Sequence, residues 1–165
     1  MFTYNRSVAI AAIAAGCAFT AALSASLARA DQTAFIGPAG WSHSDPSTGD
    51  STVKIERWHL PGDDLQSLTF IVDPNTPYTD AMAAIQKNFT TNHLKASVDK
   101  DLACKGVQGH VIEFATGPDG HKIIINRILL PNGTGVESIT YSRGEGNPFD
   151  DDVKKSIAIF CGATS

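Results

Sequence analysis

The stretch HVIEFATGPDGHKIIINRILLPNGTGVESITYSR, residues 110–143, decides the fold of this chain. It contains three runs rich in β-branched and aromatic residues, separated by GPDG (117–120) and PNGTG (131–135). Short links that contain glycine with Asn, Asp or Pro are hairpin signals. The stretch therefore predicts three consecutive antiparallel strands. Their expected bounds are 110–116, 121–130 and 136–143.

Elements of both kinds precede this stretch. VKIERWHL (53–60) and LQSLTFIVD (65–73) predict two strands joined by a turn. Thr76 and Pro77 then predict the start of a helix, with Thr76 as its cap and Pro77 at its first position. LKASVDKDLACKG (94–106) alternates as a strand does. The apolar stripe of the helix is Tyr78, Met82, Ile85 and Phe89, spaced four, three and four residues apart.

A second helix is predicted to close the chain. Asn147 and Pro148 open it, and three acidic residues follow at the end of the helix where the dipole favours negative charge. Gly162 is placed to terminate it. The acidic residues are Asp150, Asp151 and Asp152, and the apolar stripe is Phe149, Val153, Ile157 and Phe160.

This order of elements predicts one α+β domain over residues 53–162, in which two amphipathic helices sandwich a mostly antiparallel sheet. Residues 31–52 are rich in Gly, Pro, Ser and Asp, so we expect an irregular lead-in that Trp41 anchors to the domain.

Residues 1–30 have the parts of a secretory signal peptide: a positive start at Arg6, an uncharged run and a small-x-small exit at Ala28–Ala30. We expect cleavage after Ala30 and export to the periplasm or the exterior of a bacterium. Two alternatives stay open. The uncharged run approaches the length of a membrane anchor, and AAGC (14–17) resembles a lipobox that would make a lipoprotein anchored through Cys17.

The mature chain would be acidic. Removing Arg6 and Arg29 with the leader lowers the basic residues from 13 to 11 against 17 acidic residues, so the net charge becomes about −6. Nucleic-acid binding depends on neutralising phosphates with basic residues, so we exclude a nucleic-acid partner. We also expect no transmembrane segment in the mature chain, because no second long apolar run follows the leader.

Cys104 and Cys161 are the two cysteines that follow the leader. In an oxidising compartment such a pair is expected to form a disulfide. Closing a loop of this length would stabilise the fold by about 4 kcal/mol in the chain-entropy model. A redox couple is the functional alternative, but the two residues do not form a C-x-x-C motif.

The chain resembles the PsbP-like family, the α/β/α sandwich of the photosystem II extrinsic protein and its bacterial relatives. The resemblance is carried by Trp41, PGDDLQSLTFIV (61–72), GVQGHVIEF (106–114), the two hairpin links and SIAIFCG (156–162). It covers most of residues 35–162. Such proteins bind or assist assembly in exported compartments, so the resemblance implies a binding role and supplies no catalytic residue. A cystatin-like or NTF2-like α+β domain is the alternative fold.

Candidate site residues fall into three groups. His110 and His121 flank the first predicted hairpin, where they would hold a divalent ion if they met across it with a third ligand, or would be solvated. Trp41 and Trp58 would form an aromatic patch if the lead-in packs on the first strand. A third possible binding face combines Arg127, Tyr141 and Arg143.

No sequence motif predicts catalysis: the G-x-S-x-G elbow and the glycine-rich phosphate loops are missing from the sequence. We therefore predict an exported protein that is not an enzyme, carries no cofactor and binds a protein or envelope component. The alternative is a periplasmic carrier of a small ligand or metal, which would use a pocket between sheet and helix or the His110/His121 hairpin.

Overall fold

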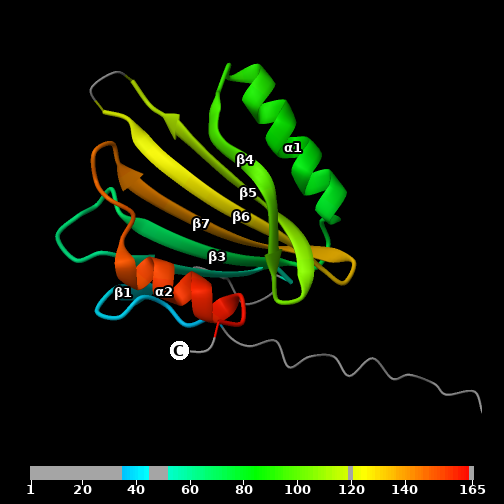
Figure 1. Cartoon of the computed structure of the whole chain (residues 1–165), viewed down its shortest axis with the longest axis horizontal. Helices are drawn as coiled ribbons and strands as arrows, with labels where there is room; N and C mark the ends of the chain where they lie inside the picture. Colours follow the sequence, from blue (N-terminus) through cyan, green and yellow to red (C-terminus); the bar gives the residue numbers. More distant parts are fainter. Residues whose placement is uncertain (1–34, 45–51, 119–120, 164–165) are drawn as a thin grey trace, which may run out of the picture. The chain divides into compact units, whose positions relative to one another are not determined.

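An antiparallel sheet makes up most of the computed structural model, which describes residues 35–44, 52–118 and 121–163 (Figure 1). Within these residues seven strands pair in the order β1-β2-β3-β7-β6-β5-β4. The three strands predicted from residues 110–143 are confirmed as β5, β6 and β7, joined by two hairpins. The bounds are β1 Ser42–Ser44, β2 Lys54–His59, β3 Ser67–Asp73, β4 Ala96–Cys104, β5 Val107–Thr116, β6 Ile123–Asn132 and β7 Gly135–Gly144.

Two helices accompany the sheet, α1 (Tyr78–Thr91) and α2 (Asp151–Phe160). The side chain of Asp150 caps α2, because its Oδ1 accepts a hydrogen bond from the backbone N–H of Val153 at 3.0 Å. No side chain caps α1, which starts after Pro77. The prediction that Thr76 caps α1 is wrong: its hydroxyl donates to Asp73 Oδ2 at 2.7 Å instead.

The predicted fold class is wrong in its layers. The protein is mostly a seven-stranded antiparallel sheet with two short helices, not a sheet sandwiched by two amphipathic helices. The helices have 14 and 10 residues, and α1 has no buried residue. Strands lie about 4.8 Å apart and a helix with its side chains is about 10 Å across, so neither helix can form a layer over seven strands.

The lead-in contributes more than an anchor. Residues Ser42–Ser44, expected to be irregular, form β1 and pair with β2 so that His43 lies opposite Trp58. Phe35 and Trp41 are buried, and Trp41 packs on Tyr141 with ring centroids 6.3 Å apart. Residue 37 passes so close to the Trp58 indole that a Cβ there would lie 2.0 Å from its Nε1, so only glycine fits.

Alternation along the strands divides the sheet into two faces. We call them the α2 face, which carries Phe70, Val111, Ile128 and Ile139, and the α1 face, which carries Ile112, Phe114 and Leu129. On the α2 face, Phe160 packs edge-on against Phe70 at 5.5 Å. On the α1 face, Phe89 meets Phe114 at 4.8 Å. Figure 1 shows α2 (red) in front of the sheet, with α1 (green) beside β4 in this view.

The predicted disulfide is confirmed: Cys104, the last residue of β4, is bonded to Cys161, the residue after α2. The backbone N–H of Lys105 also donates to the Cys161 carbonyl at 3.3 Å. The predicted signal peptide, residues 1–30, and with it Cys17, lies outside the described residues. None of the described helices combines the length and the apolar composition needed to cross a bilayer.

Candidate functional site

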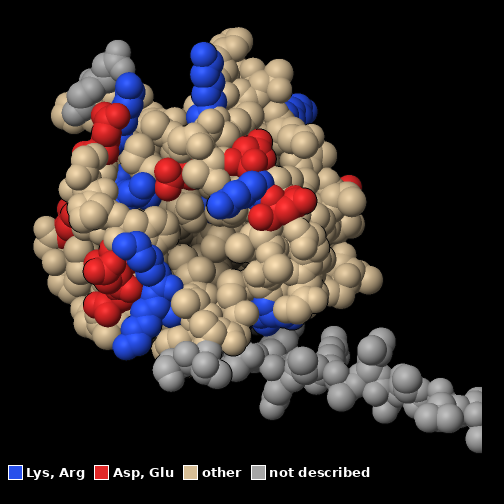
Figure 2. All heavy atoms as spheres, in the orientation of Figure 1, with Lys and Arg blue, Asp and Glu red and all other residues tan. Residues whose placement is uncertain are grey.

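A hollow on the α2 face is the candidate site. Its volume is about 330 Å³, and it lies between α2 and strands β4, β5 and β6. Figure 2 shows the hollow as uncharged surface in the middle of the molecule, with charged side chains around it. We call it the α2 pocket. Its wall consists of Leu102, Ala103, Val111, Asn126, Ile128, Phe149, Lys154, Ile157, Ala158 and Cys161.

Strand register and helix periodicity bring this wall together. Val111 of β5 lies opposite Ile128 of β6, so their side chains form the floor on one face. Lys154, Ile157 and Ala158 of α2 and Cys161, the residue after it, have the i, i+3, i+4, i+7 spacing that places residues on one side of a helix. The disulfide fixes the end of α2 to the end of β4. The pocket therefore persists only while α2 stays docked.

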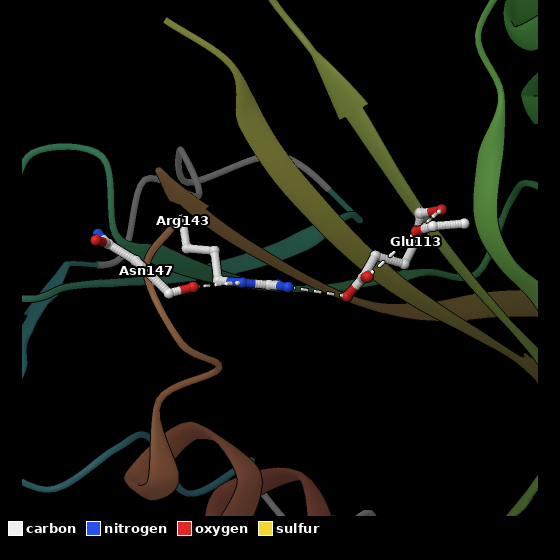
Figure 3. A network of polar contacts seen from close by, with 4 residues as sticks. Glu113, Arg143 and Asn147 are labelled. Atoms are coloured by element: carbon white, nitrogen blue, oxygen red, sulfur yellow. Dashed lines mark hydrogen bonds and ion pairs between the residues drawn. The ribbon is translucent and has the colours of Figure 1, made fainter. Parts of the chain in front are cut away.

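A partly buried polar network lies next to two wall residues of the pocket, Asn126 and Phe149 (Figure 3). The Arg143 guanidinium donates from Nη2 to Glu113 Oε2 and from Nε to the Asn147 carbonyl, both at 3.2 Å. Glu113 Oε1 accepts from the Ser97 hydroxyl, also at 3.2 Å. The side chains of Arg143 and Glu113 are 12% and 20% exposed, so this ion pair is largely shielded from water.

Two wall residues connect this network to the pocket. Asn126 lies directly opposite Glu113 in the β5–β6 ladder. The Cζ atom of Arg143 lies 5.3 Å from the ring centroid of Phe149, and Lys154 Nζ lies 5.9 Å from the same ring. The Phe149 ring therefore has two cations beside it, those of Arg143 and Lys154. Each cation is attracted to the ring by a cation–π interaction. Arg143 itself is not one of the wall residues.

A second buried charge pair lies near the disulfide. Lys105 Nζ is 3.1 Å from Glu137 Oε2, and Asn132 donates to Glu137 Oε1 at 2.9 Å. Glu137 is 5% exposed, and Lys105 Nζ lies 4.3 Å from the ring centroid of Phe160. Both carboxylate oxygens are therefore satisfied, so this pair has a structural role and offers no free group to a ligand.

The aromatic residues predicted as a binding face lie in the core. Trp41, Trp58 and Tyr141 are all buried, and Tyr141 has no exposed surface. Burial raises the pKa of the Tyr141 phenol, whose O–H donates to Gln66 Oε1 at 2.7 Å. His43 does stack on Trp58, with ring centroids 4.9 Å apart. The structure therefore brings these residues together as packing and not as an exposed patch.

The predicted group of Arg127, Tyr141 and Arg143 is divided between the two faces. Arg127 lies opposite Thr140 and donates to its hydroxyl from Nε at 3.1 Å. Thr140 and Tyr141 are neighbours in β7, so their side chains point to opposite faces. Arg127 is therefore on the α1 face, where burial lowers the pKa of its guanidinium. Tyr141 and Arg143 are on the α2 face.

His110 and His121 do not meet. His110 pairs with Leu129, six ladder positions before the Thr116–Ile123 pair at the end of the hairpin, and six residues of strand span about 20 Å. His121 lies beyond that end, in the hairpin link. His110 instead contacts Asp99 through Nε2 at 2.6 Å and Asp101 through Nδ1 at 3.2 Å. No group of three metal-ligating residues occurs in the part of the chain described here.

Sequence reasoning missed most of the pocket. None of Glu113, Asn126, Asn147 and Lys154 was predicted as a site residue from the sequence. A signal was present for Asn126, because a polar residue at a core-facing position among six apolar residues of HKIIINRILL is unusual.

Comparison with known proteins adds little. No family model matches the chain, and no match to a curated protein is significant. Among eight solved chains with significant structural matches is PA94 from Pseudomonas aeruginosa, a protein of unknown function. It is 13% identical, the match covers 68% of this chain and 74% of PA94, and the TM-score is 0.41. A likeness at this TM-score establishes neither a shared fold nor a shared function, and the PsbP-like resemblance stays a prediction.

Proposed function

We propose that this protein is an exported, non-enzymatic binding protein that holds a small, largely apolar molecule in the α2 pocket. The observation that carries the proposal is the cavity itself, about 330 Å³ with a wall of mostly apolar side chains. Cavities of this kind, apolar with a few polar groups, are the usual form of small-molecule sites, which span roughly 300–1,000 Å³.

The chemistry of the wall supports binding and not catalysis. Its two polar side chains are Asn126 and Lys154, and its cysteine, Cys161, is oxidised in the disulfide. The wall formed by the described residues has no carboxylate, histidine or hydroxyl, and the amine of Lys154 is paired with Asp151 at 2.8 Å, so the wall mainly offers contact surface. This favours the small-ligand carrier, the second of the two predicted functions.

Binding of a protein or envelope component has weaker support. The predicted patch for such a partner was aromatic or Arg-bearing: its aromatic residues Trp41, Trp58 and Tyr141 are buried, and its two arginines lie on opposite faces of the sheet. The export part of the proposal rests on the leader sequence of residues 1–30 and is compatible with the disulfide, since disulfides persist in oxidising compartments.

The test is a substitution that fills the pocket with a larger side chain. Ala158 is an exposed wall residue of α2, so Ala158→Phe places a ring in the cavity without disturbing the core. Ala84→Phe makes the same change at an exposed position of α1 and is the matched control. Isopropylnaphthalene, an apolar fluorescent probe, is titrated into the purified full-length mature protein.

We expect the wild type and Ala84→Phe to bind the probe and Ala158→Phe to lose at least tenfold in affinity. Native mass spectrometry of the exported protein should also show a copurifying small molecule in the wild type that Ala158→Phe lacks. A wild type that binds no probe, or an Ala158→Phe variant that binds it equally well, refutes the proposal.

A further inference from the structure

Arg127 is a half-buried arginine without an acidic partner. Its Nε donates to the Thr140 hydroxyl at 3.1 Å, and this is the one polar contact of its side chain among the described residues. Burial lowers the pKa of the guanidinium, and no described carboxylate opposes this effect. Charges removed from water are normally paired, because losing hydration is costly. Nitrogens Nη1 and Nη2 of Arg127 therefore remain available to an external anion.

Both of these nitrogens can be reached from solvent. Among the side-chain nitrogen and oxygen atoms of the described residues, only Arg143 Nη1 is fully buried and also lacks a hydrogen-bond partner. Nη1 and Nη2 of Arg127 have no partner in the same part of the chain, so neither nitrogen is fully buried. A ligand on the α1 face can therefore contact the Arg127 guanidinium.

A row of polar side chains crosses the α1 face beside Arg127. Residues that are directly paired in a sheet point to the same face. From β6 to β1, successive pairs align Arg127, Thr140, Thr69, Arg57 and Ser44. Arg57 is exposed, and three strand spacings, about 14 Å, separate its Cα from that of Arg127. The row thus places two hydroxyl groups between two arginines.

The acidic residues that the strands carry on this face have other partners. Asp99 and Asp101 of β4 both contact His110, at 2.6 and 3.2 Å. Asp99 is two ladder positions from Arg127, about 10 Å away across the sheet. Asp73, the last residue of β3, accepts hydrogen bonds from the turn that follows it. The row around Arg127 is therefore positive, although the mature chain as a whole would be acidic.

We propose that Arg127 is the centre of an anion site on the α1 face, which binds a carboxylate group of its ligand. The two terminal nitrogens of a guanidinium lie side by side and match the two oxygens of a carboxylate. The hydrogen bond from Nε to Thr140 holds the guanidinium in place, and Arg57 attracts a second negative group. This site lies on the opposite face from the α2 pocket and does not depend on the proposed function.

Nuclear magnetic resonance titrations of the full-length mature protein, at constant ionic strength, test the site. The probes are succinate, its neutral analogue succinamide, inorganic phosphate and a capped peptide with two glutamates. We expect succinate and the peptide to shift the backbone amides of Thr69 and Thr140 in a saturable way, and succinamide to leave them unchanged. Tighter binding of the peptide identifies the ligand as an acidic segment of a protein, and tighter binding of succinate identifies a small carboxylic acid.

Variants locate the binding group. Arg127→Gln should weaken succinate binding about tenfold or more, because it removes both charged donors. Arg127→Lys keeps the charge but not the two parallel donors, so it should weaken binding by about threefold. Arg57→Gln should weaken it by about twofold, since exposed charges interact weakly. The control is Lys155→Gln, which removes the same charge from an exposed position of α2 and should leave binding unchanged.

Stability measurements separate a binding role of Arg127 from a structural one. Arg127→Met replaces the half-buried charge with an apolar side chain, so without ligand its urea midpoint should equal or exceed that of the wild type. Succinate should raise the midpoint of the wild type alone, because only the wild type binds it. If Arg127→Met is less stable than the wild type without ligand, or if succinate stabilises both proteins equally, Arg127 is a structural residue.

The titrations can also overturn the site. If succinamide causes the same shifts as succinate, or if neither succinate nor the peptide causes any, no carboxylate binds at Arg127. If phosphate binds more tightly than both carboxylate probes, the chemical class of the ligand is wrong.

Discussion

The two helices of this protein have similar sequence patterns and different structural roles. Both carry an apolar stripe that faces the sheet, yet α1 has no buried residue, whereas α2 buries Val153, Ser156 and Phe160 in only ten residues. α2 is fixed at both ends, by the Asp150 cap and by the disulfide at Cys161. α1 has neither a side-chain cap nor a covalent tether.

The difference shows that burial depends on what surrounds a helix as much as on its own stripe. Phe160 contacts Phe35 and Phe70 at 5.5 Å each, so the lead-in completes the core around α2. Among the described residues, Phe89 of α1 has one aromatic ring contact, to Phe114. The pocket lies on the side where packing is tighter, which suits a site that must hold its shape.

The largest contrast is expected from truncating one phenylalanine on each helix. Phe160→Ala removes a ring that is 6% exposed and should lower the free energy of unfolding by about 3–5 kcal/mol. Phe89→Ala removes a half-buried ring and should cost about 1–2 kcal/mol. Urea denaturation of both variants measures the two losses. Equal losses would show that α1 is packed as tightly as α2 and would remove the contrast.

Opening the disulfide should make α2 behave more like α1. The variant Cys104→Ser/Cys161→Ser should lower the free energy of unfolding by about 2–4 kcal/mol, because it frees a loop that joins residues 57 apart in the sequence. Hydrogen exchange should become faster at the amides of α2. At the amides of α1, protection measured relative to global unfolding should stay the same.

Reductant provides the control for this variant. It should destabilise the wild type by a similar amount and have no effect on the double variant. If α2 keeps its protection without the disulfide, then side-chain packing alone docks the helix, and the pocket does not depend on the covalent tether.

The sequence predicted local features well. The hairpin links at 117–120 and 131–135, the seven strands except β1, and the two helices all follow from turn residues and periodicity. β1 was missed because SHS (42–44) has no apolar alternation and forms a strand only by pairing with β2. The sandwich was predicted wrongly because an amphipathic stripe shows which side of a helix is covered and not how much of a sheet the helix covers.

The site was harder to predict than the fold because it depends on register. Glu113 and Arg143 lie 30 residues apart and meet only because β6 separates β5 from β7 with a fixed stagger. A shift of one residue would send Arg143 to the α1 face and leave Glu113 unpaired. The sequence does not reveal the register between β6 and β7, so Arg127 and Arg143 were predicted on one face. The observed register places them on opposite faces.

The smallest effect concerns the caps that distinguish the helix starts. Asp150→Ala removes the acceptor of the Val153 N–H and should lower the free energy of unfolding by about 1 kcal/mol, whereas Asp150→Asn keeps an acceptor oxygen and should cost less. Pro77→Ser gives α1 the cap it lacks and should raise the free energy of unfolding by a few tenths of a kcal/mol.

Thermal unfolding monitored by circular dichroism measures all three cap variants under one condition. Because Asp150 starts the helix that forms one wall of the pocket, Asp150→Ala should also weaken probe binding, and Pro77→Ser should not change it. If both caps alter stability but neither alters binding, the start of α2 does not shape the pocket. The disulfide end, with Ile157, Ala158 and Cys161, is then what positions α2 over the sheet.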